Sequence, residues 1–499
     1  MLKKIEKYGW NVNRSIILDY RDQLINDWKS LFNYMPSENK ESYSLFSCFS
    51  TVLVRSLVLF ELNHLKNNSL NLFDNLGELN NPFINQFISN KGIKLNSLDY
   101  RRTLYNQIKI KQFIKCVVLK KAYNFNLIKT YPIQYFRSTG LVKKHIISST
   151  SETSFFYQNL YYFLFKYSKK KNNIKNAYID SMVESFYERG KAFGITYLED
   201  NIKHINNLIS TLYNLHINFI ECMNSHYKKA PEEIWVFSPQ PLQSLISAWV
   251  RVNGGKVVAH EHGCGEGWCK NPIDPIFDFE YSDKFIAYTT ENILNYKKWL
   301  SSNSIYLGKN CEFETIDDNS NVKAITKYPI KRNKIKNICI IGTTYRCDSM
   351  ILSMQCHGLV LMNMHQKILE SVKKLGYDIK LKIHPENSMD VFINYQDLDR
   401  SESIFSTLEM YDLFIFDSYQ STAFFHSLKN TDKPIIILDS NVNPINEFAK
   451  NSLSKRCSII DIKFDEKGLL NIFDEQLKIA IDESVNLHSI EFEYQYHGG

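Results

Sequence analysis

The sequence predicts an α/β protein built on two doubly wound parallel sheets, with a helical elaboration at the N-terminus. Two observations lead to this fold class. Short apolar runs of strand length recur in the second half of the chain, each closed by polar, small or turn-forming residues, and segments with helical spacing separate them. In addition, a chain of 499 residues is too long for one ordinary core, so we expect two or three domains.

The first two hundred residues read as mainly helical packing elements. Residues 9–65 carry apolar side chains at helical spacing, residues 67–96 are rich in turn formers, and residues 114–119 (IKCVVL) predict a strand. Residues 155–167 are dense in aromatic side chains and precede a lysine run at 169–171. A membrane surface or a polyanion would fit that pattern, but a buried helix with a solvated basic end explains it more simply.

A first βαβ region follows a long periodic helix at residues 197–227. We expect strands at 233–237, 255–259 and 284–288 and helices at 243–252 and 291–300. The middle strand runs into His260, Glu261, His262 and Gly263, a loop that combines ionisable side chains with small residues. We expect this loop to hold the catalytic groups of the first sheet.

The predicted domain boundaries follow from the change in composition after this region. Residues 1–310 form the N-terminal α/β domain with helical insertions, the polar residues 311–334 form a linker, and residues 335–499 form the C-terminal α/β domain.

The second sheet shows the clearest alternation of strands and helices. We expect strands at 337–341, 379–383, 413–416, 433–438 and 459–461, and helices at 363–376, 421–430 and 466–482. Ligands of open α/β sheets bind outside the carboxyl ends of the strands. The polar residues that follow the first three strands should therefore meet at one site: Thr343, Thr344 and Arg346; His384; and Ser418, Ser421 and Thr422.

The three hydroxyls of that set, Ser418, Ser421 and Thr422, lie at the predicted start of a helix. Free N–H groups and the helix dipole favour a phosphate there. Each hydroxyl also fits a simple capping role, and taken alone capping is the more frequent use of such residues. His384 similarly fits a strand end before a turn proline, so the phosphate-site hypothesis depends on all three loops occurring in order.

Composition limits the other classes of function. The net charge of +7 is modest for this length and no recognition motif is present, so we expect no nucleic-acid partner. The ten scattered cysteines indicate a reducing compartment, and neither a signal sequence nor a membrane span is visible. We expect a cytoplasmic protein, with peripheral contact at the inner face of the cell membrane as an option.

No metal or other cofactor is expected from the motifs. The cysteine pairs lack the spacing of a zinc site. Asp397 and Asp399 resemble a metal-binding Asp-x-Asp, but no partner ligands stand nearby in the sequence, and we interpret them as a solvated turn.

Three motifs of the second sheet, together with the His-Gly pair of the first, resemble a family of bacterial enzymes. These are the Gly-Thr-Thr-Tyr-Arg that ends at Arg346, His384-Pro385, and the Asp-Ser-Tyr-Gln-Ser-Thr that ends at Thr422 and is followed by Lys433-Pro434. They look like the signature of bacterial surface-polysaccharide transferases of GT-B type, among them CDP-glycerol glycerophosphotransferases, Kdo transferases and His-Pro sialyltransferases. The likeness covers approximately residues 257–438. It implies two Rossmann-like domains that face each other across a cleft.

The resemblance implies a nucleotide-activated donor, most simply a cytidine nucleotide, in the C-terminal domain. His384, Ser418, Ser421 and Thr422 would hold the donor phosphate, and Thr343, Thr344 and Arg346 would line the same pocket. The two family patterns imply different catalytic bases. The glycerophosphotransferases have a catalytic histidine in a His-Gly pair, which corresponds to His262-Gly263. The sialyltransferases have a catalytic carboxylate in an acidic-acidic-Gly motif, which corresponds to Glu261-His262-Gly263 with a histidine in place of the second acidic residue.

A histidine titrates near working pH without help, whereas a glutamate needs desolvation. We therefore rank His262 first, Glu261 second and His260 third as catalytic base. The resulting hypothesis is a metal-independent transferase that moves an acidic sugar of the sialic-acid or Kdo type from a CMP-sugar to a hydroxyl of a glycan or lipid-linked glycan acceptor. The alternatives are a CDP-glycerol-dependent glycerophosphotransferase and a two-lobed binding protein without catalysis.

Overall fold

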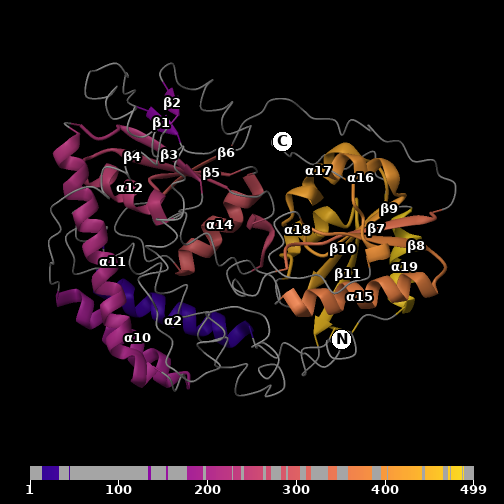
Figure 1. Ribbon diagram of the computed structural model, residues 1–499, viewed down its shortest axis with the longest axis horizontal. Coiled ribbons are helices and arrows are strands. Elements are labelled where there is room, and N and C mark those ends of the chain that lie inside the picture. The colour runs from indigo at the N-terminus through magenta and orange to yellow at the C-terminus, as the bar shows by residue number, and fades with distance from the viewer. Residues whose placement is uncertain are drawn as a thin grey trace.

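The computed structural model describes two six-stranded sheets and the helices around them (Figure 1). The described residues are 14–32, 44, 133–135, 153–155, 177–194, 198–227, 229–237, 241–261, 266–270, 282–287, 290–303, 311–315, 335–345, 358–384, 395–401, 403–440, 444–464, 470–471, 474–485 and 487. The predicted strand at 114–119 lies outside them, as does the aromatic segment beyond Phe155.

The first sheet has the strand order β2-β1-β3-β4-β5-β6, and all its pairings are parallel. Its strands are β1 Ile133–Tyr135, β2 Thr153–Phe155, β3 Glu233–Phe237, β4 Lys256–His260, β5 Lys284–Ala287 and β6 Glu312–Thr315. β6 lies within the stretch predicted to be a linker. The first lobe, which we define as β1–β6 with its helices, therefore extends to at least Thr315.

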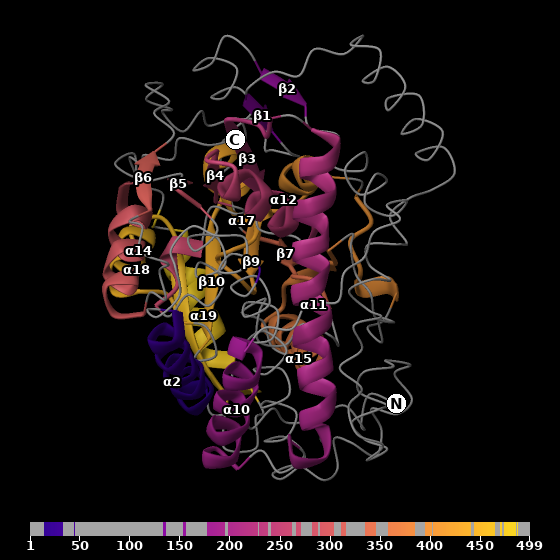
Figure 2. The same cartoon turned by 90° about the vertical axis from the view of Figure 1, so that its left-hand side faces the viewer.

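The helices of the first lobe include three long ones in its N-terminal part. The long ones are α2 Arg14–Phe32, α10 Ala177–Ala192 and α11 Leu198–His226. The others are α12 Pro241–Val252, the short 3-10 helix η2 Glu266–Trp268 and α14 Thr290–Asn303. Figure 2 shows α11 running along one side of the molecule with α10 beside its lower end, and α10 also contacts α2. The long helix predicted at 197–227 is confirmed as α11.

The second sheet repeats the topology of the first, with the order β12-β11-β10-β9-β7-β8. Its strands are β7 Asn337–Ile341, β8 Asp378–Lys382, β9 Leu413–Phe416, β10 Ile435–Ser440, β11 Ser458–Phe464 and β12 Leu470–Asn471, of which only β12 pairs antiparallel among the described strands. All four residues of β9 are buried. Such a continuous apolar run is typical of a parallel strand covered on both faces.

The helices of the second lobe, defined as β7–β12 with its helices, confirm most of the predicted alternation. They are α15 Gly358–Lys374, the 3-10 helix η3 Tyr395–Asp397, α16 Ile404–Met410, α17 Thr422–Asn430, α18 Glu447–Leu453 and α19 Asp474–Ser484. The helix predicted at 466–482 was wrong in its first part, because β12 pairs there with β11 before α19 begins. α16 and α18 are short and had not been predicted.

One hydrophobic cluster joins the two lobes. It contains Trp235, Val258 and Ile286 from the first sheet, Trp268 and Cys269 from the loop after β4, and the aromatic side chains of α17 together with residues of β7, β9 and β10. Trp268 and Cys269 are both buried. Apolar side chains of both lobes therefore pack together in this cluster.

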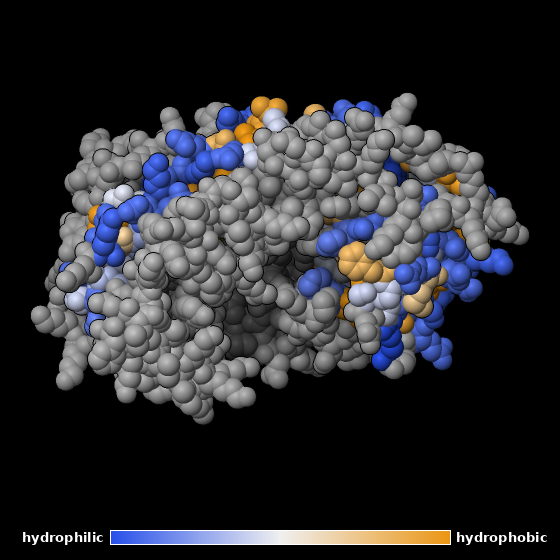
Figure 3. All heavy atoms as spheres, turned by 90° about the horizontal axis from the view of Figure 1, so that it is seen from above, coloured by the Kyte–Doolittle hydropathy of each residue, from blue (hydrophilic) through white to orange (hydrophobic). Residues whose placement is uncertain are grey.

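The described part of the surface carries few large apolar side chains. Figure 3, the view from above, shows mostly hydrophilic residues where the described chain is visible, with hydrophobic ones in small groups. The exposed large hydrophobic residues of the described chain are Leu294, Phe405, Met410, Phe448 and Ile479. No helix in the described part of the chain has the length and apolar character needed to cross a bilayer.

Candidate functional site

The candidate site of the second lobe lies where its strand order reverses. β7 lies between β8 and β9, so the chain leaves β7 toward one edge of the sheet and later returns to the other side of the same strand. In doubly wound sheets a ligand binds at the carboxyl ends of the strands at such a switch point. The predicted polar loops follow β7, β8 and β9, the three strands that form it.

The strand register aligns the ends of these three strands. Ile341 of β7 pairs with Lys382 of β8 on one side and with Phe416 of β9 on the other. Thr343, His384 and Ser418 each stand two residues beyond this row. The predicted residues of the three loops therefore begin side by side, as expected from the sequence.

Asp417 connects the loop after β9 to the loop after β7. Its Oδ2 accepts hydrogen bonds from the backbone N–H of Thr343 at 2.7 Å and from the hydroxyl of Thr343 at 2.9 Å. Nε2 of His365 lies 3.0 Å from the same oxygen, within hydrogen-bond distance. Both donors of Thr343 are thus used inside the protein, so this residue braces the two loops.

His365 extends the network to Tyr345. Its Nδ1 lies 2.6 Å from the Tyr345 hydroxyl, and the side chains of His365 and Asp417 are fully buried. The tautomer that donates from Nε2 to Asp417 leaves Nδ1 to accept from Tyr345. Burial, followed by the nearby Asp417 charge, raises the pKa of Tyr345 well above its ordinary value, so this hydroxyl stays protonated and available as a donor.

Sequence reasoning missed the roles of His365, Tyr345 and Asp417. Tyr345 and Asp417 stood within the quoted motifs without an assigned contact, and His365 lies inside α15, where a single histidine gives no signal. Gly342 offers an indirect clue, because a Cβ at this position would lie 3.0 Å from Cε1 of His365. A glycine directly after a buried strand therefore marks the close approach of another group.

Ser418 and Ser421 stand at the beginning of α17. Ser421 is its N-cap, and the hydroxyl oxygen accepts from the backbone N–H of Ala423 at 3.2 Å. The hydroxyl oxygen of Ser418 accepts from the N–H of Gln420 at 3.2 Å. The capping role considered for these residues is therefore confirmed for Ser421, whereas Ser418 closes a turn before the helix. Each hydroxyl keeps its hydrogen as a donor, which an anion at this helix N-terminus would accept.

The remaining predicted residues of this site lie in the loops after β7 and β8 and at the first residue of α17. Thr344 is buried in the loop after β7, and His384 is half-buried after β8. Arg346 and the side chain of Thr422 lie outside the described residues. The strand register thus places His384 and Ser418 on either side of the loop after β7, and Asp417 joins that loop to the one that leads to Ser421.

In the first lobe, two of the three predicted bases are buried. His260 ends β4, and its Nδ1 lies 3.2 Å from the carbonyl oxygen of Glu261. Oε1 of Glu261 accepts from Nδ2 of Asn292 at 2.8 Å and from the hydroxyl of Tyr296 at 2.9 Å. Glu261 thus fastens the end of β4 to α14. His262, the first-ranked base, follows directly in the chain and lies outside the described residues.

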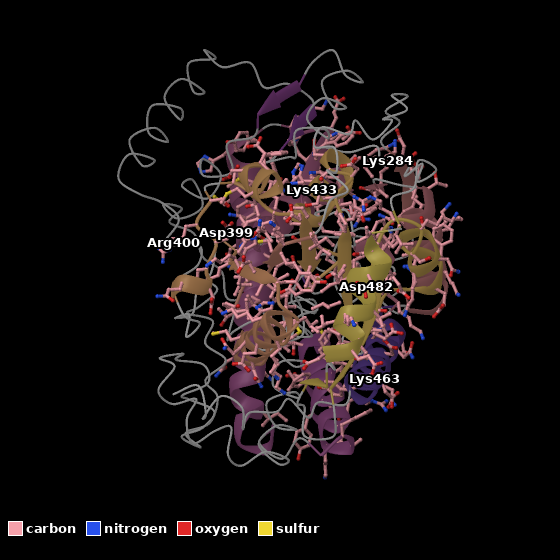
Figure 4. The ribbon with its side chains drawn as sticks, turned by 90° about the vertical axis from the view of Figure 1, so that its right-hand side faces the viewer. Lys284, Asp399, Arg400, Lys433, Lys463 and Asp482 are labelled. Carbon is pink, nitrogen blue, oxygen red and sulfur yellow. The ribbon has the colours of Figure 1, made fainter. Side chains whose placement is uncertain are left out.

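The Asp397–Asp399 stretch was wrongly predicted to be a solvated turn. Asp399 accepts from the Lys382 ammonium, from the Ser401 and Thr407 hydroxyls and from the Tyr411 hydroxyl, and its side chain is 2% exposed. Although burial opposes it, the hydrogen bonds from Ser401 and the Lys382 charge hold the pKa of Asp399 below its ordinary value. Figure 4 shows Arg400 at the edge of the second lobe with Asp399 inward of it.

No group of three or more His, Cys, Asp or Glu side chains is placed to hold a metal ion within the described ranges. Comparison of the sequence with protein-family models finds no matching family, and comparison with curated proteins finds no match. The geometry of the two lobes is therefore the basis for a functional assignment.

Proposed function

We propose that this protein is a transferase of GT-B type that binds a nucleotide-activated donor in the second lobe and an acceptor alcohol against the first. The donor class that best suits the motifs is a CMP-sugar carrying an acidic sugar, and the acceptor is a glycan or lipid-linked glycan hydroxyl. The acceptor and donor sites would face each other across a cleft between the lobes.

The observation that carries this proposal is the contact between the loop after β4 and helix α17. Trp268, in that loop, packs against Phe425 of α17 with ring centroids 5.0 Å apart. The same loop contains Glu261 and His262, and the same helix begins at the serines of the switch point. Two motifs more than 150 residues apart in the sequence thus belong to elements that touch.

The chemistry follows from the side chains of the two lobes. A base in the β4 loop, His262 in our ranking, takes the proton of the acceptor hydroxyl as its oxygen attacks the anomeric carbon. The bond from that carbon to the phosphate breaks, and the nucleotide leaves with the bonding electrons. The hydroxyls of Ser418 and Ser421, the N-terminus of α17 and His384 would stabilise the charge that grows on the phosphate oxygens.

Asp417 supports this step without touching the substrate in our scheme. By holding the Thr343 backbone and the His365 ring, it keeps the loops after β7 and β9 in a fixed relation. Preorganised donors contribute most when they do not have to move as charge develops.

The proposal is tested first by nucleotide binding. A thermal-shift screen with CMP, CDP, UDP and GDP should show stabilisation by cytidine nucleotides, because a ligand that binds only the folded state raises its apparent stability. The double variant Ser418→Ala/Ser421→Ala should lose most of that shift. Equal or absent shifts with all four nucleotides would count against a cytidine-nucleotide donor.

Turnover then tests the role of His262. With CMP-sialic acid, CMP-Kdo and CDP-glycerol as donors, product mass identifies the transferred group, since CMP is released in each case. His262→Ala should bind CMP normally and lose roughly a hundredfold or more in turnover, on the scale of a lost general base. His226→Ala, at the exposed end of α11, is the matched control. Normal turnover by the His262 variant would remove the assigned base.

A further inference from the structure

Residues 267–270, which we call the bridging segment, form backbone hydrogen bonds between the two lobes. The carbonyl oxygen of Trp268 accepts from the backbone N–H of Asn446 at 2.7 Å, and the N–H of Lys270 donates to the carbonyl of Pro444 at 2.9 Å. Cys269 and Ile445 form an isolated antiparallel bridge between these two bonds. The bridging segment therefore pairs with the second lobe as a short strand would.

The indole of Trp268 adds an aromatic contact to this pairing. It is 3% exposed and lies against Phe425 at 5.0 Å and Phe424 at 6.5 Å between ring centroids, the latter in an edge-on arrangement. Both rings belong to the first turn of α17. The backbone N–H of Phe424 donates to the carbonyl of Ser421 at 2.9 Å, so the indole lies within one turn of the N-cap serine.

The bridging segment is fixed equally firmly to the first lobe. Nδ2 of Asn295 donates to the carbonyl of Gly267 at 2.7 Å and to that of Cys269 at 3.2 Å. Gly267 packs directly on Asn292, since a Cβ at Gly267 would lie 2.4 Å from its Cγ. Asn292 also holds the carboxylate of Glu261. Helix α14 thus binds the β4 loop just before and just after residues 262–265.

We propose that Trp268 is a positioning residue for the transfer reaction. By seating the β4 loop on the first turn of α17, it sets the position of the loop that carries the base relative to the hydroxyls that receive the leaving phosphate. This role rests on the proposed function, whereas the bridge itself is a property of the fold. Trp268 has no contact with substrate in this scheme and acts through the two elements that it joins.

The bridge is tested by amide hydrogen exchange, which does not require activity. The Lys270 and Asn446 amides donate across the interface in wild type and should exchange slowly. In Trp268→Ala both should exchange at least about tenfold faster, because the covering ring is gone, whereas Trp268→Phe should keep most of the protection. Unchanged exchange at both amides in a folded Trp268→Ala protein would overturn the inference.

A matched control separates the bridge from general loss of core packing. Trp249 of α12 is 1% exposed, lies tilted against Tyr227 with ring centroids 5.6 Å apart, and donates from Nε1 to Asn224 within the first lobe. Trp249→Ala removes a ring of the same size and should leave the Lys270 and Asn446 amides protected. If Trp249→Ala loses as much protection at these two amides as Trp268→Ala, the faster exchange comes from a general loss of stability, and a specific role for Trp268 is overturned.

A second variant covers the case in which Trp268→Ala does not fold. Asn446 donates from Nδ2 to the carbonyl of Gly267 at 3.0 Å and caps α18 through Oδ1, which accepts from the N–H of Ala449. Asn446→Ser keeps a capping oxygen and the backbone N–H that donates to Trp268, but loses the Nδ2 donor to Gly267. We expect several-fold faster exchange of the Lys270 amide, and wild-type exchange there would contradict the bridge.

Turnover decides between a structural bridge and a positioning role. Trp268→Ala should bind CMP within about twofold of wild type and lose at least about tenfold in kcat, with Trp268→Phe restoring most of it. If wild type transfers the donor group and Trp268→Ala keeps its kcat, the positioning role alone is overturned. If wild type neither binds nucleotide nor turns over, the proposed function fails and the catalytic role of Trp268 fails with it, while the exchange result still stands.

Discussion

At the scale of single residues, Asp417 shows how the switch point is held. One carboxylate oxygen receives the N–H and hydroxyl of Thr343 and faces Nε2 of His365, while Oδ1 is buried with no hydrogen-bond partner among the described residues. A single atom, Oδ2 of Asp417, thus links the loops after β7 and β9 with helix α15.

Asp417→Ala should therefore lower the free energy of unfolding by about 2–4 kcal/mol, because it leaves buried donors of Thr343 and His365 without an acceptor. Thr343→Val, which removes one hydroxyl donor, should cost about 1 kcal/mol. Urea unfolding measures both. Asp461→Ala, whose side chain is 63% exposed, is the control and should change the free energy by less than about 1 kcal/mol. Equal effects of Asp417→Ala and Asp461→Ala would show that the brace has no energetic role.

His216 provides a pH-dependent test at the same scale. It is buried in α11, and burial lowers its pKa to about 3 from the ordinary 6.5. The unfolded chain therefore takes up a proton on this ring below pH 6.5 while the folded chain does not, so stability is fully present above pH 6.5 and falls toward pH 3.

His216→Leu should remove this dependence. Relative to wild type, the variant should gain about 1.4 kcal/mol in unfolding free energy per pH unit below 6.5, with no such trend above it. Urea unfolding at pH 8, 6.5 and 5 provides the comparison, with the exposed His226→Leu on the same helix as control. A difference between wild type and His216→Leu that stays constant with pH would mean that the ring is solvated.

At the scale of elements, Lys433 shows that one part of the quoted motifs is structural. Its ammonium donates to the carbonyls of Leu408, Glu409 and Tyr411 at the end of α16, with distances of 2.7, 3.3 and 2.6 Å. Burial lowers the pKa of Lys433. The residue precedes β10, at the amino end of the strand, and because β10 runs parallel to β9 and β7 this is the opposite end from the switch-point loops.

Lys433→Met should cost about 2 kcal/mol of unfolding free energy, because the last carbonyls of α16 lose a charged donor that satisfies them. Nucleotide binding should be unchanged, since the residue lies away from the site. Urea unfolding and the CMP thermal shift measure the two effects. Lys455→Met, at an exposed turn, is the control. A loss of CMP binding without a loss of stability would instead favour a direct role for Lys433 in the site.

At the scale of the whole molecule, the two lobes repeat one strand order and are joined by one hydrophobic cluster. Each sheet places its first described strand between the second and the third, so each has a reversal point. The hydrophobic cluster runs from β3, β4 and β5 through Trp268 to α17. This continuity makes the bridging segment the natural place to test whether the lobes act together.

The sequence predicted much of the secondary structure and little of the packing. β3 and β9 have the predicted bounds, and β7 also agrees, because each is a continuous apolar run between turn residues. The short helices α16 and α18 escaped prediction, since seven residues are too few for a periodic pattern. Part of the candidate site, His384 and the serines, was predicted from the strand ends, whereas His365 was not.

The sequence by itself determined that this protein is α/β, that the strands from β7 to β11 are parallel, and that polar loops follow β7, β8 and β9, because apolar runs and turn residues are local signals. Only the tertiary structure decided that His365 meets Asp417, that Asp399 is buried, and that Trp268 seats the β4 loop on α17. These contacts join residues far apart in the chain. They are selected when the whole core closes and buried polar groups must find partners, so no single stretch of sequence encodes them.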